Sequence, residues 1–330
     1  MKQGLHPLVM ILLVAAAALF GRVLPTWTLS LATIAASNAL IALGIVVLAR
    51  TGNVSFGQGL FYAAGGYGVA LIANAWGITD ALAQMLIGAV CAGLLGLVIG
   101  PLLARYTGIF FGMLTLALSM VLYGALVKTT ALGGSDGFNI GRPTLFGMVF
   151  TDTREADFML YAVSVVTTGL AGVAATILFR SELGLASLAV RENNLRVEYL
   201  GISSNRVITI NFAIAAVFAG ASGAFALMAQ RHIDPQFAYW TTSGEFVFVA
   251  VLAGYQSVAA VFVASIALEL VRSFSNLYLP NTWQLVLGVF LLGVILFLPR
   301  GIGSLWIRQR RKRIERASGP TVTIQNEAAQ

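Results

Sequence analysis

The sequence predicts an all-α, polytopic membrane protein, and three observations support this prediction. Hydrophobic residues make up 58% of the 330 residues and charged residues only 10%, and the mean hydropathy is +0.87. A soluble domain carries roughly 25% charged residues, so a water-soluble enzyme is excluded. The 35 glycines against 8 prolines are typical of closely packed transmembrane helices. Several uncharged stretches also reach about 20 residues, the length that crosses the hydrocarbon core of a bilayer.

The spanning helices follow from these uncharged stretches in order along the chain. A short apolar run at residues 8–20 is either an uncleaved first helix or the core of a cleaved signal peptide. Residues 29–49, 81–104, 106–127, 158–179 and 207–230 contain no Asp, Glu, Lys or Arg, and each is long enough to span alone. The uncharged residues 51–79 and 246–268, with a final apolar run at 282–299, raise the expected number of crossings to between eight and ten.

The placement of Lys and Arg predicts the orientation of the chain. If Lys2 is cytoplasmic and the sides alternate, fourteen of the twenty Lys and Arg residues lie in the cytoplasm, as the positive-inside rule requires. Residues 129–157 then form an external loop, and residues 181–206 form a cytoplasmic loop. The chain is thus expected to consist of a transmembrane domain, residues 1–299, and a basic cytoplasmic tail, residues 300–330, with both termini in the cytoplasm.

Two of the uncharged stretches are predicted to be interrupted. One helix over residues 246–268 would place the basic tail outside, so we expect a break near the GYQS sequence at residues 254–257, giving two short crossings or a re-entrant hairpin. A second break is expected in TGNVSFGQG, residues 51–59. Non-helical backbone at membrane depth is tolerated where it is buried in protein or lines a water-filled cavity. Paired breaks in the two halves of a chain point to a transport site, which makes both segments candidates for a translocation pathway.

Polar residues at these breaks are the candidate pathway residues. Asn53, Ser55 and Gln58 offer uncharged donors and acceptors that suit a zwitterion, or else they only satisfy the backbone of a broken helix. Phe56 is either an apolar gate or a core residue. Glu245 begins the second broken segment and is a candidate for binding a substrate ammonium, the alternative being an interfacial carboxylate in water.

Few carboxylates are available inside the membrane, which disfavours an ion-coupled secondary carrier. Glu269 has Arg272 at position i+3, a helical spacing that favours a structural ion pair between them. An ion-coupled carrier nevertheless stays open as the alternative class, because broken helices occur there too.

Residues for enzymatic chemistry are missing from the sequence. No GxxxxGK[ST] loop occurs, so any ATP used for transport is bound and hydrolysed by another polypeptide, and this chain is expected to bind no cofactor. Ser135 and Ser222 lie in GxSxG and GxSG patterns, but a serine nucleophile needs a nearby base, and the only histidines are His6 and His232. A single cysteine, Cys91, rules out an intramolecular disulfide and a thiolate metal cluster, and no metal site is expected.

The hydrophilic residues 181–206 mix apolar residues at helical spacing with charges of both signs. Leu188, Arg191, Leu195, Glu198 and Ile202 would follow one side of a helix, so we expect a short amphipathic element that rests on a partner or on the membrane. A solvated connecting loop is the alternative.

This segment resembles the coupling loop of ABC importer permeases, in particular the LivM-type permeases of the branched-chain amino acid transporter family. The similarity runs from RENN at residues 191–194 to LG at 200–201. Three further blocks agree with the family: GNVSFGQG at 52–59 with GGY at 65–67, GGSDG at 133–137, and FLPRGI at 297–302. The matches follow the expected order along nearly the whole membrane region.

The resemblance implies an ABC importer permease fold in a bacterial inner membrane, a second, LivH-type permease, two cytoplasmic ATPases and a periplasmic or lipid-anchored solute-binding protein. The residues implied in ATPase coupling are Arg191, Glu192, Asn193, Leu200 and Gly201, and Asp136 is the expected contact for the binding protein. The implied solute is a branched-chain or related amino acid, with urea or an amide as the nearest alternative, and no nucleic acid is involved.

Overall fold

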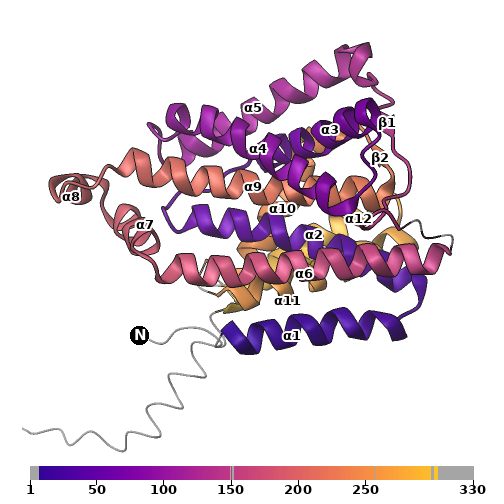
Figure 1. The fold of residues 1–330 in the computed structure, drawn as a ribbon. Coiled ribbons are helices and arrows are strands. Elements are labelled where there is room, and N and C mark those ends of the chain that lie inside the picture. Colours follow the sequence, from indigo (N-terminus) through magenta and orange to yellow (C-terminus); the bar gives the residue numbers. More distant parts are fainter. Residues whose placement is uncertain (1–6, 149, 151, 256, 299–300, 304–330) are drawn as a thin grey trace, which may run out of the picture.

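The computed structural model describes residues 7–148, 150, 152–255, 257–298 and 301–303, with side chains described from residue 14 onward. Ten α-helices run approximately alongside one another (Figure 1). They are α1 (Pro7–Phe20), α2 (Thr26–Ala49), α3 (Gln58–Trp76), α4 (Ala81–Leu103), α5 (Ile109–Lys128), α6 (Thr153–Arg180), α9 (Ser204–Gln230), α10 (Trp240–Ala253), α11 (Val258–Tyr278) and α12 (Trp283–Phe297). The predicted basic tail lies outside the described residues, apart from residues 301–303.

Six of these helices are long and apolar enough to cross a membrane: α2, α4, α5, α6, α9 and α11. They include all five helices predicted from isolated uncharged stretches. The stretch 246–268 is broken as expected, because α10 ends at Ala253 and α11 begins at Val258. With 14 residues, α10 is about 21 Å long, which is shorter than a hydrocarbon core of about 30 Å.

The two ends of the bundle carry different structure (Figure 1). At one end, which we call the α7 end, lie the short helices α7 (Glu182–Glu192) and α8 (Asn194–Tyr199). At the other, the sheet end, β1 (Phe138–Asn139) pairs antiparallel with β2 (His232–Ile233). Three short 3-10 turns complete the chain: η1 (Gly21–Val23), η2 (Thr130–Leu132) and η3 (Pro235–Ala238). The all-α prediction missed this sheet, because a pair of two-residue strands leaves no alternating pattern in the sequence.

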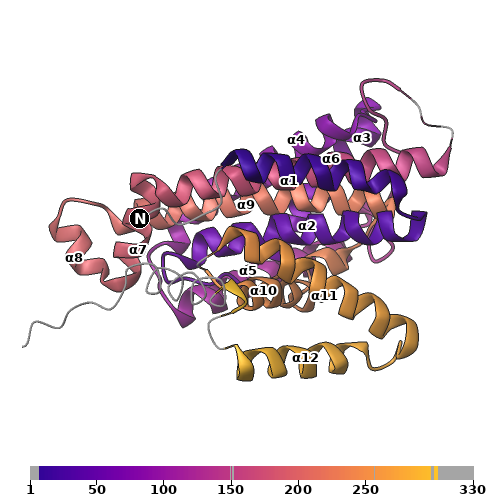
Figure 2. The ribbon, with the colours of Figure 1, turned by 90° about the horizontal axis from the view of Figure 1, so that it is seen from below.

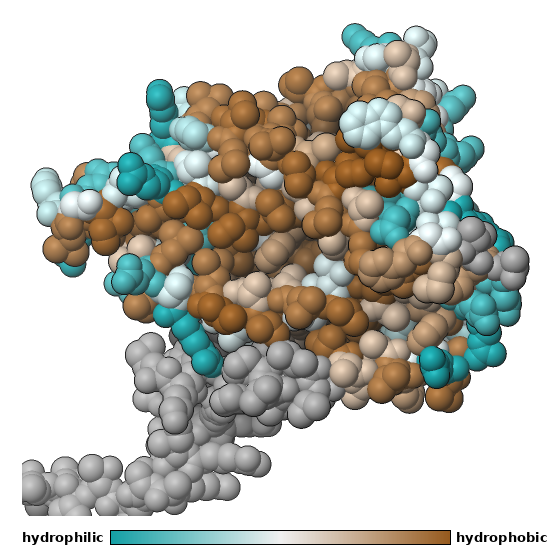
Figure 3. Space-filling model, in the orientation of Figure 1, coloured by the Kyte–Doolittle hydropathy of each residue, from teal (hydrophilic) through white to brown (hydrophobic). Residues whose placement is uncertain are grey.

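On the face shown in Figure 3, apolar side chains cover the middle of the molecule, and hydrophilic ones gather at its two ends. Apart from Lys128 in the last turn of α5, the exposed large side chains of α4 and α5 are apolar, including Leu86, Leu94, Ile109, Phe110 and Val121. A water-soluble protein rarely exposes such a continuous apolar surface, whereas lipid accommodates it. The protein is therefore a multi-pass membrane protein, with α12 at the edge of the bundle beside α11 (Figure 2).

Helix α9 forms the centre of the bundle and packs against α2, α3 and α4. Its approach to α3 and α4 depends on glycine. A Cβ atom on Gly220 would overlap the carbonyl of Gly88 and the side chain of Ala92, and a Cβ on Gly65 would overlap the backbone of Gly220. Gly220 thus lies at a helix contact where the backbones of α3, α4 and α9 touch at one level.

Replacing Gly220 with leucine is expected to destabilise the protein strongly, because the clash is with backbone that cannot move aside. Overpacking a core costs about 1–3 kcal/mol even where side chains can adjust, so the G220L variant should lose at least that much. Thermal unfolding of the purified chain in detergent measures the effect. The control is Gly124→Leu on α5, where a Cβ has open space within 4 Å; equal destabilisation by both variants would contradict the packing explanation.

Candidate functional site

The first predicted helix break meets the start of α10 inside the bundle, whereas the second predicted break, residues 254–257, lies at the other end of α10. The chain is non-helical from residue 50 to 57, between α2 and α3, and again around η3, before α10 begins. The backbone N–H of Gly59 donates a hydrogen bond to Ser243 Oγ at 2.9 Å, and the ring of Tyr62 stacks on that of Phe237 with centroids 4.9 Å apart. The first turns of α3 and α10, 184 residues apart in sequence at this hydrogen bond, therefore lie side by side.

This meeting point lies near the middle of the membrane-spanning layer. Ser119 is the eleventh of the 20 residues of α5, and its Oγ donates to the carbonyl of Ala238 at 2.7 Å. Phe56 N–H donates to Thr115 Oγ1, one turn closer to the α7 end, at 3.1 Å. The non-helical segment 50–57 thus enters the bundle from the α7 end, and α3 starts within the layer and not at its surface.

Two of the predicted polar residues serve the backbone of this segment. Asn53 Oδ1 accepts a hydrogen bond from the N–H of Gly108 at 2.9 Å, and Ser55 Oγ accepts from the N–H of Gly57 at 3.2 Å. Both residues are buried. These contacts agree with the interpretation that Asn53 and Ser55 satisfy the hydrogen bonds of the broken helix backbone, and they do not require a bound zwitterion. Asn53 Nδ2 has no partner among the described residues.

Gln58 differs from its neighbours. It is the first residue of α3, so that the predicted break ends just before it, and its exposed fraction is 0%. Neither Oε1 nor Nε2 has a hydrogen-bond partner within the described part of the chain. Leaving a buried polar group unpaired costs about 1–3 kcal/mol, and such groups in native structures usually have a functional reason. Gln58 is therefore the leading candidate for a polar contact made only in another state of the protein.

Phe56 is 39% exposed and packs against Gly112 of α5, with its Cδ2 atom 3.1 Å from the position of a Cβ on that glycine. Phe56 is thus not a core residue, and its role as a gate stays a prediction.

The prediction of an ion pair between Glu269 and Arg272 is wrong, because Arg272 pairs with Glu245 instead. Arg272 Nη1 lies 3.1 Å from Glu245 Oε2 on α10, and its guanidinium lies 5.5 Å from the ring centroid of Trp283 on α12. Glu269 Oε2 instead accepts a hydrogen bond from Asn38 Nδ2 on α2 at 2.9 Å. The two residues share a helix but face different neighbours, because i and i+3 side chains pair only when no better partner lies on an adjacent helix.

Side chains at the α7 end connect α7 to both breaks, and sequence reasoning did not anticipate this. The guanidinium of Arg191, in the last turn of α7, lies 3.8 Å from the ring centroid of Tyr255, in the turn between α10 and α11. The Cγ atom of Arg191 is also 3.2 Å from the position of a Cβ on Gly52, whose φ of +85° favours glycine. The sequences TGN at residues 51–53 and GYQS at residues 254–257 predicted the two breaks. Nothing in the sequence shows that one arginine contacts both of them.

Arg50 lies beside this contact and is buried. Its guanidinium lies over the ring of Phe179 at 4.1 Å. Burial lowers the pKa of Arg50 from its ordinary value, and the nearby charge of Arg191 acts in the same direction. The α7 end of the first break is therefore held by cation–π packing.

The single amphipathic helix expected over residues 188–202 is replaced by two helices. Asn193 adopts an extended backbone, with φ of −163°, and its side chain accepts a hydrogen bond from the N–H of Arg196 at 3.0 Å, which starts α8. Asparagine favours such caps over helix interiors. Leu195, Tyr199 and Leu200 are exposed, and Gly201 has a φ of +82° just after α8. This end of the molecule presents apolar side chains on a short, separate helix.

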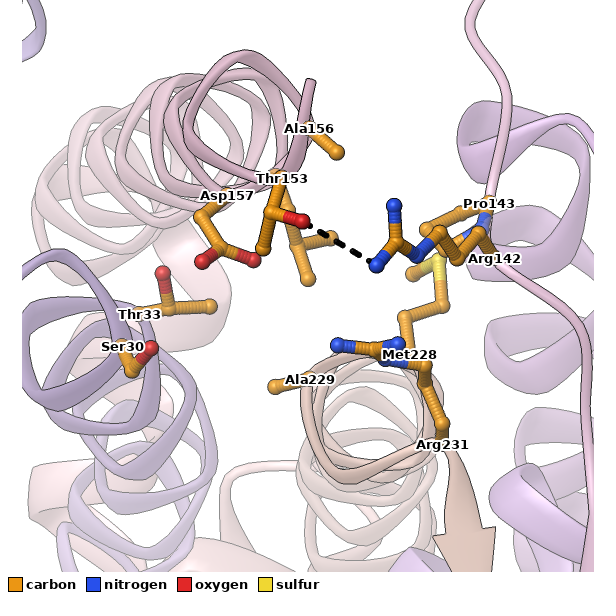
Figure 4. A pocket seen from close by; sticks show the side chains of 11 residues that line it. Ser30, Thr33, Arg142, Pro143, Thr153, Ala156, Asp157, Met228, Ala229 and Arg231 are labelled. Atoms are coloured by element: carbon orange, nitrogen blue, oxygen red, sulfur yellow. Dashed lines mark hydrogen bonds between the residues drawn. The ribbon is translucent and has the colours of Figure 1, made fainter. Parts of the chain in front are cut away.

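At the sheet end, Asp136 is exposed in a turn and accepts a hydrogen bond from Ser135 Oγ at 3.0 Å. A small cavity nearby is flanked by Arg142, Arg231 and Asp157, with Arg142 Nη2 donating to Thr153 Oγ1 at 3.1 Å (Figure 4). Its volume of about 30 Å³ suits a water molecule and not an organic solute. Among the described residues, no group of three His, Cys, Asp or Glu side chains could hold a metal ion.

Comparison with known proteins covers most of the chain. Residues 27–297 match the family model for the permease component of the branched-chain amino acid transport system. The high-affinity branched-chain amino acid transport system permease protein LivM of Salmonella typhimurium is 28% identical over 318 residues, which cover 88% of this chain and 73% of LivM. LivM of Escherichia coli is 28% identical over 83% of this chain and 69% of its own. The permease protein LivH of Salmonella typhimurium is 26% identical over 82% of this chain and 92% of its own. No solved structure matches the chain.

Proposed function

The chain belongs to the family of permease components of branched-chain amino acid transport systems, and from this premise we propose that it forms, with a second permease, the translocation pathway of an ABC importer for branched-chain or related amino acids. One observation carries the proposal: the family match spans residues 27–297, which is nearly the whole helical bundle. The chain is similar along most of its length to both LivM and LivH, which supports a pair of related permeases in one transporter.

Two ATPase subunits and a solute-binding protein complete the proposed transporter. The sequence lacks a nucleotide-binding loop of its own, so ATP is bound and hydrolysed by the ATPases and this chain is not an enzyme. The distribution of Lys and Arg supports a cytoplasmic α7 end in a bacterial inner membrane. The sheet end, with Asp136, then faces the binding protein.

The meeting of the first helix break with the start of α10 supports the position of the pathway. Asn53 and Ser55 hold the segment before α3 in its non-helical form, which leaves Gln58 without a partner at the start of the helix. Phe56 and Glu245 lie on the partly exposed sides of the same two segments. Discontinuous helices near the bilayer midplane are the usual place for a transport site, because their ends supply polar groups where an intact helix has none.

The contacts of Arg191 support a route for coupling. In this proposal the ATPases dock on residues 181–206, with Arg191, Glu192, Asn193, Leu200 and Gly201 as the contact region. ATP-driven motion of α7 then acts through Arg191 on Gly52 and Tyr255, and so on both breaks together. Alternate opening of the pathway to the two sides follows from rocking the segments around a fixed site.

The test is to purify the tagged chain from native membranes in mild detergent, identify the co-purifying subunits by mass spectrometry, and reconstitute the complex in proteoliposomes. ATPases and a second permease should co-purify, and loaded binding protein plus ATP should drive uptake of leucine but not of urea. Reversing the charges of Arg191 and Glu192 together should release the ATPases. A chain that purifies alone and transports without ATP would instead be an ion-coupled carrier, and uptake of urea would favour the amide alternative.

A further inference from the structure

The partly exposed side of α10 carries the polar side chains of Thr241 and Glu245 within the apolar middle of the molecule. Thr241, Gly244, Glu245 and Phe248 occupy positions i, i+3, i+4 and i+7 of one helix face, and all four are partly exposed. A Cβ on Gly244 would meet nothing within 4 Å, so the space beside Glu245 is open. The opposite side of α10, which includes Ser243 and Phe246, is buried. Ionisable groups at membrane depth are costly and usually functional.

The ion pair between Glu245 and Arg272 borders this open space. The side chain of Arg272 is 39% exposed and that of Glu245 is 17% exposed, so neither is sealed in the bundle. The pair joins α10 to α11, and Trp283 of α12 lies against the guanidinium as an aromatic wall. Glu269 provides the contrast, because it is only 6% exposed and is held by Asn38.

We propose that Arg272 and Glu245 together bind the charged ends of an α-amino acid, with Arg272 holding the carboxylate and Glu245 the ammonium. This inference rests on the proposed function and specifies the substrate class as a zwitterion. The guanidinium offers a planar pair of N–H donors that matches a carboxylate, and a carboxylate at Glu245 matches an ammonium. Arg272 is the residue that this inference adds to the pathway.

When a zwitterion takes the place of the ion pair between Glu245 and Arg272, every charge stays paired. In the absence of solute the two side chains neutralise one another at 3.1 Å. An entering zwitterion gives each of them a replacement partner of the same sign as the one it loses, so no isolated charge is left in a poorly solvated place. Urea and simple amides carry no net charges and cannot make this replacement. The same ion pair therefore admits a zwitterion and excludes an uncharged amide.

The experiment uses the reconstituted complex with its loaded binding protein and compares four variants: Glu245→Gln, Arg272→Gln, the charge-swapped double variant E245R/R272E, and the control Glu269→Gln. Uptake of amino acid and the ATPase activity stimulated by the binding protein are measured for each. Both single variants should assemble and hydrolyse ATP but lose uptake by about a hundredfold, as expected when one member of a charge pair is removed. The control keeps the hydrogen bond from Asn38 and should transport within about twofold of the unaltered complex.

The charge-swapped variant separates a binding role from a structural one. A purely structural ion pair is restored by the swap, whereas a binding site for a zwitterion is not, because the carboxylate and ammonium would have to exchange places while the aliphatic side chain keeps its pocket. Uptake restored by the swap, or lost equally in E269Q, would overturn the inference. If the swapped complex does not assemble, Arg272→Lys decides: it keeps the charge, so a raised KM for uptake supports the site and an unchanged KM refutes it. Absence of ATP-driven amino acid uptake by the unaltered complex would instead refute the proposed function itself.

Discussion

Replacing Arg191 with alanine is expected to uncouple ATP hydrolysis from transport. The substitution removes the cation–π contact with Tyr255 and the packing against Gly52, which are the described contacts between α7 and the two helix breaks. A partly desolvated cation–π contact contributes about 0.5–2 kcal/mol, and coupling energies of this size change a linked equilibrium on the order of tenfold. Uptake per ATP hydrolysed in proteoliposomes should fall by about that factor.

Substituting Tyr255, the aromatic partner of Arg191, tests the same coupling role more specifically. Tyr255→Leu should reproduce the uncoupling, whereas Tyr255→Phe keeps an aromatic face for the guanidinium and should retain coupling. Arg105→Ala, an exposed arginine in the turn between α4 and α5 at the same end, is the matched control and should leave coupling unchanged. If Arg191→Ala complexes that keep their ATPases show unchanged uptake per ATP hydrolysed, the transmission role is refuted.

Replacing Gln58 with leucine is expected to raise stability and lower transport. The amide is fully buried, and neither of its polar atoms has a partner among the described residues. An apolar side chain of similar size therefore removes the free-energy cost of burying an unpaired polar group, which is about 1–3 kcal/mol. Stabilisation at the expense of activity is the usual result when a functional residue is replaced for packing. Thermal unfolding should shift upward, and ATP-driven uptake should fall by an order of magnitude or more, since one polar contact to the solute is worth about that much.

Gln84 of α4 provides the control for this substitution. Its side chain is also buried, and its Oε1 has no partner among the described residues, but its Nε2 donates to the carbonyl of Ile78 at 2.9 Å, a bond that Gln58 lacks. Gln84→Leu should therefore lower stability and leave uptake per folded complex unchanged. A Gln58→Leu variant that transports normally would show that Gln58 has no role in the pathway, and the segment before α3 would then be structural.

The sequence was sufficient for the features that depend on composition and local pattern. Stretches without charges give the long helices directly, because the bilayer demands about 20 apolar residues and tolerates no unpaired backbone. The interruption at residues 254–257 followed from the charge balance across the membrane, and the one predicted at residues 51–59 followed from glycine and polar residues in an apolar context. Both signals are local, so a single sequence contains them.

What the sequence could not show are contacts between distant segments. Whether Arg272 pairs with Glu269 or with Glu245 depends on how α10 lies against α11, and helical spacing favours the partner that is nearer in sequence. Asn193 ends α7 and caps α8, where the apolar periodicity alone predicts one continuous helix. The candidate pathway residues Asn53, Ser55 and Gln58 are all buried, and only their hydrogen bonds separate Gln58, which has no partner among the described residues, from Asn53 and Ser55, which hold the backbone. The functional roles of all of them stay predictions.

The small sheet gives α10 a second mechanical input. β2 is followed within seven residues by the start of α10, and β1 ties it to the loop that carries Asp136. The far end of α10 leads to Tyr255, which Arg191 holds. A protein docked outside and a nucleotide event inside would therefore pull on opposite ends of one short helix whose middle carries Glu245. Such a helix responds to the coincidence of two signals, which would limit ATP consumption to moments when a loaded binding protein is present.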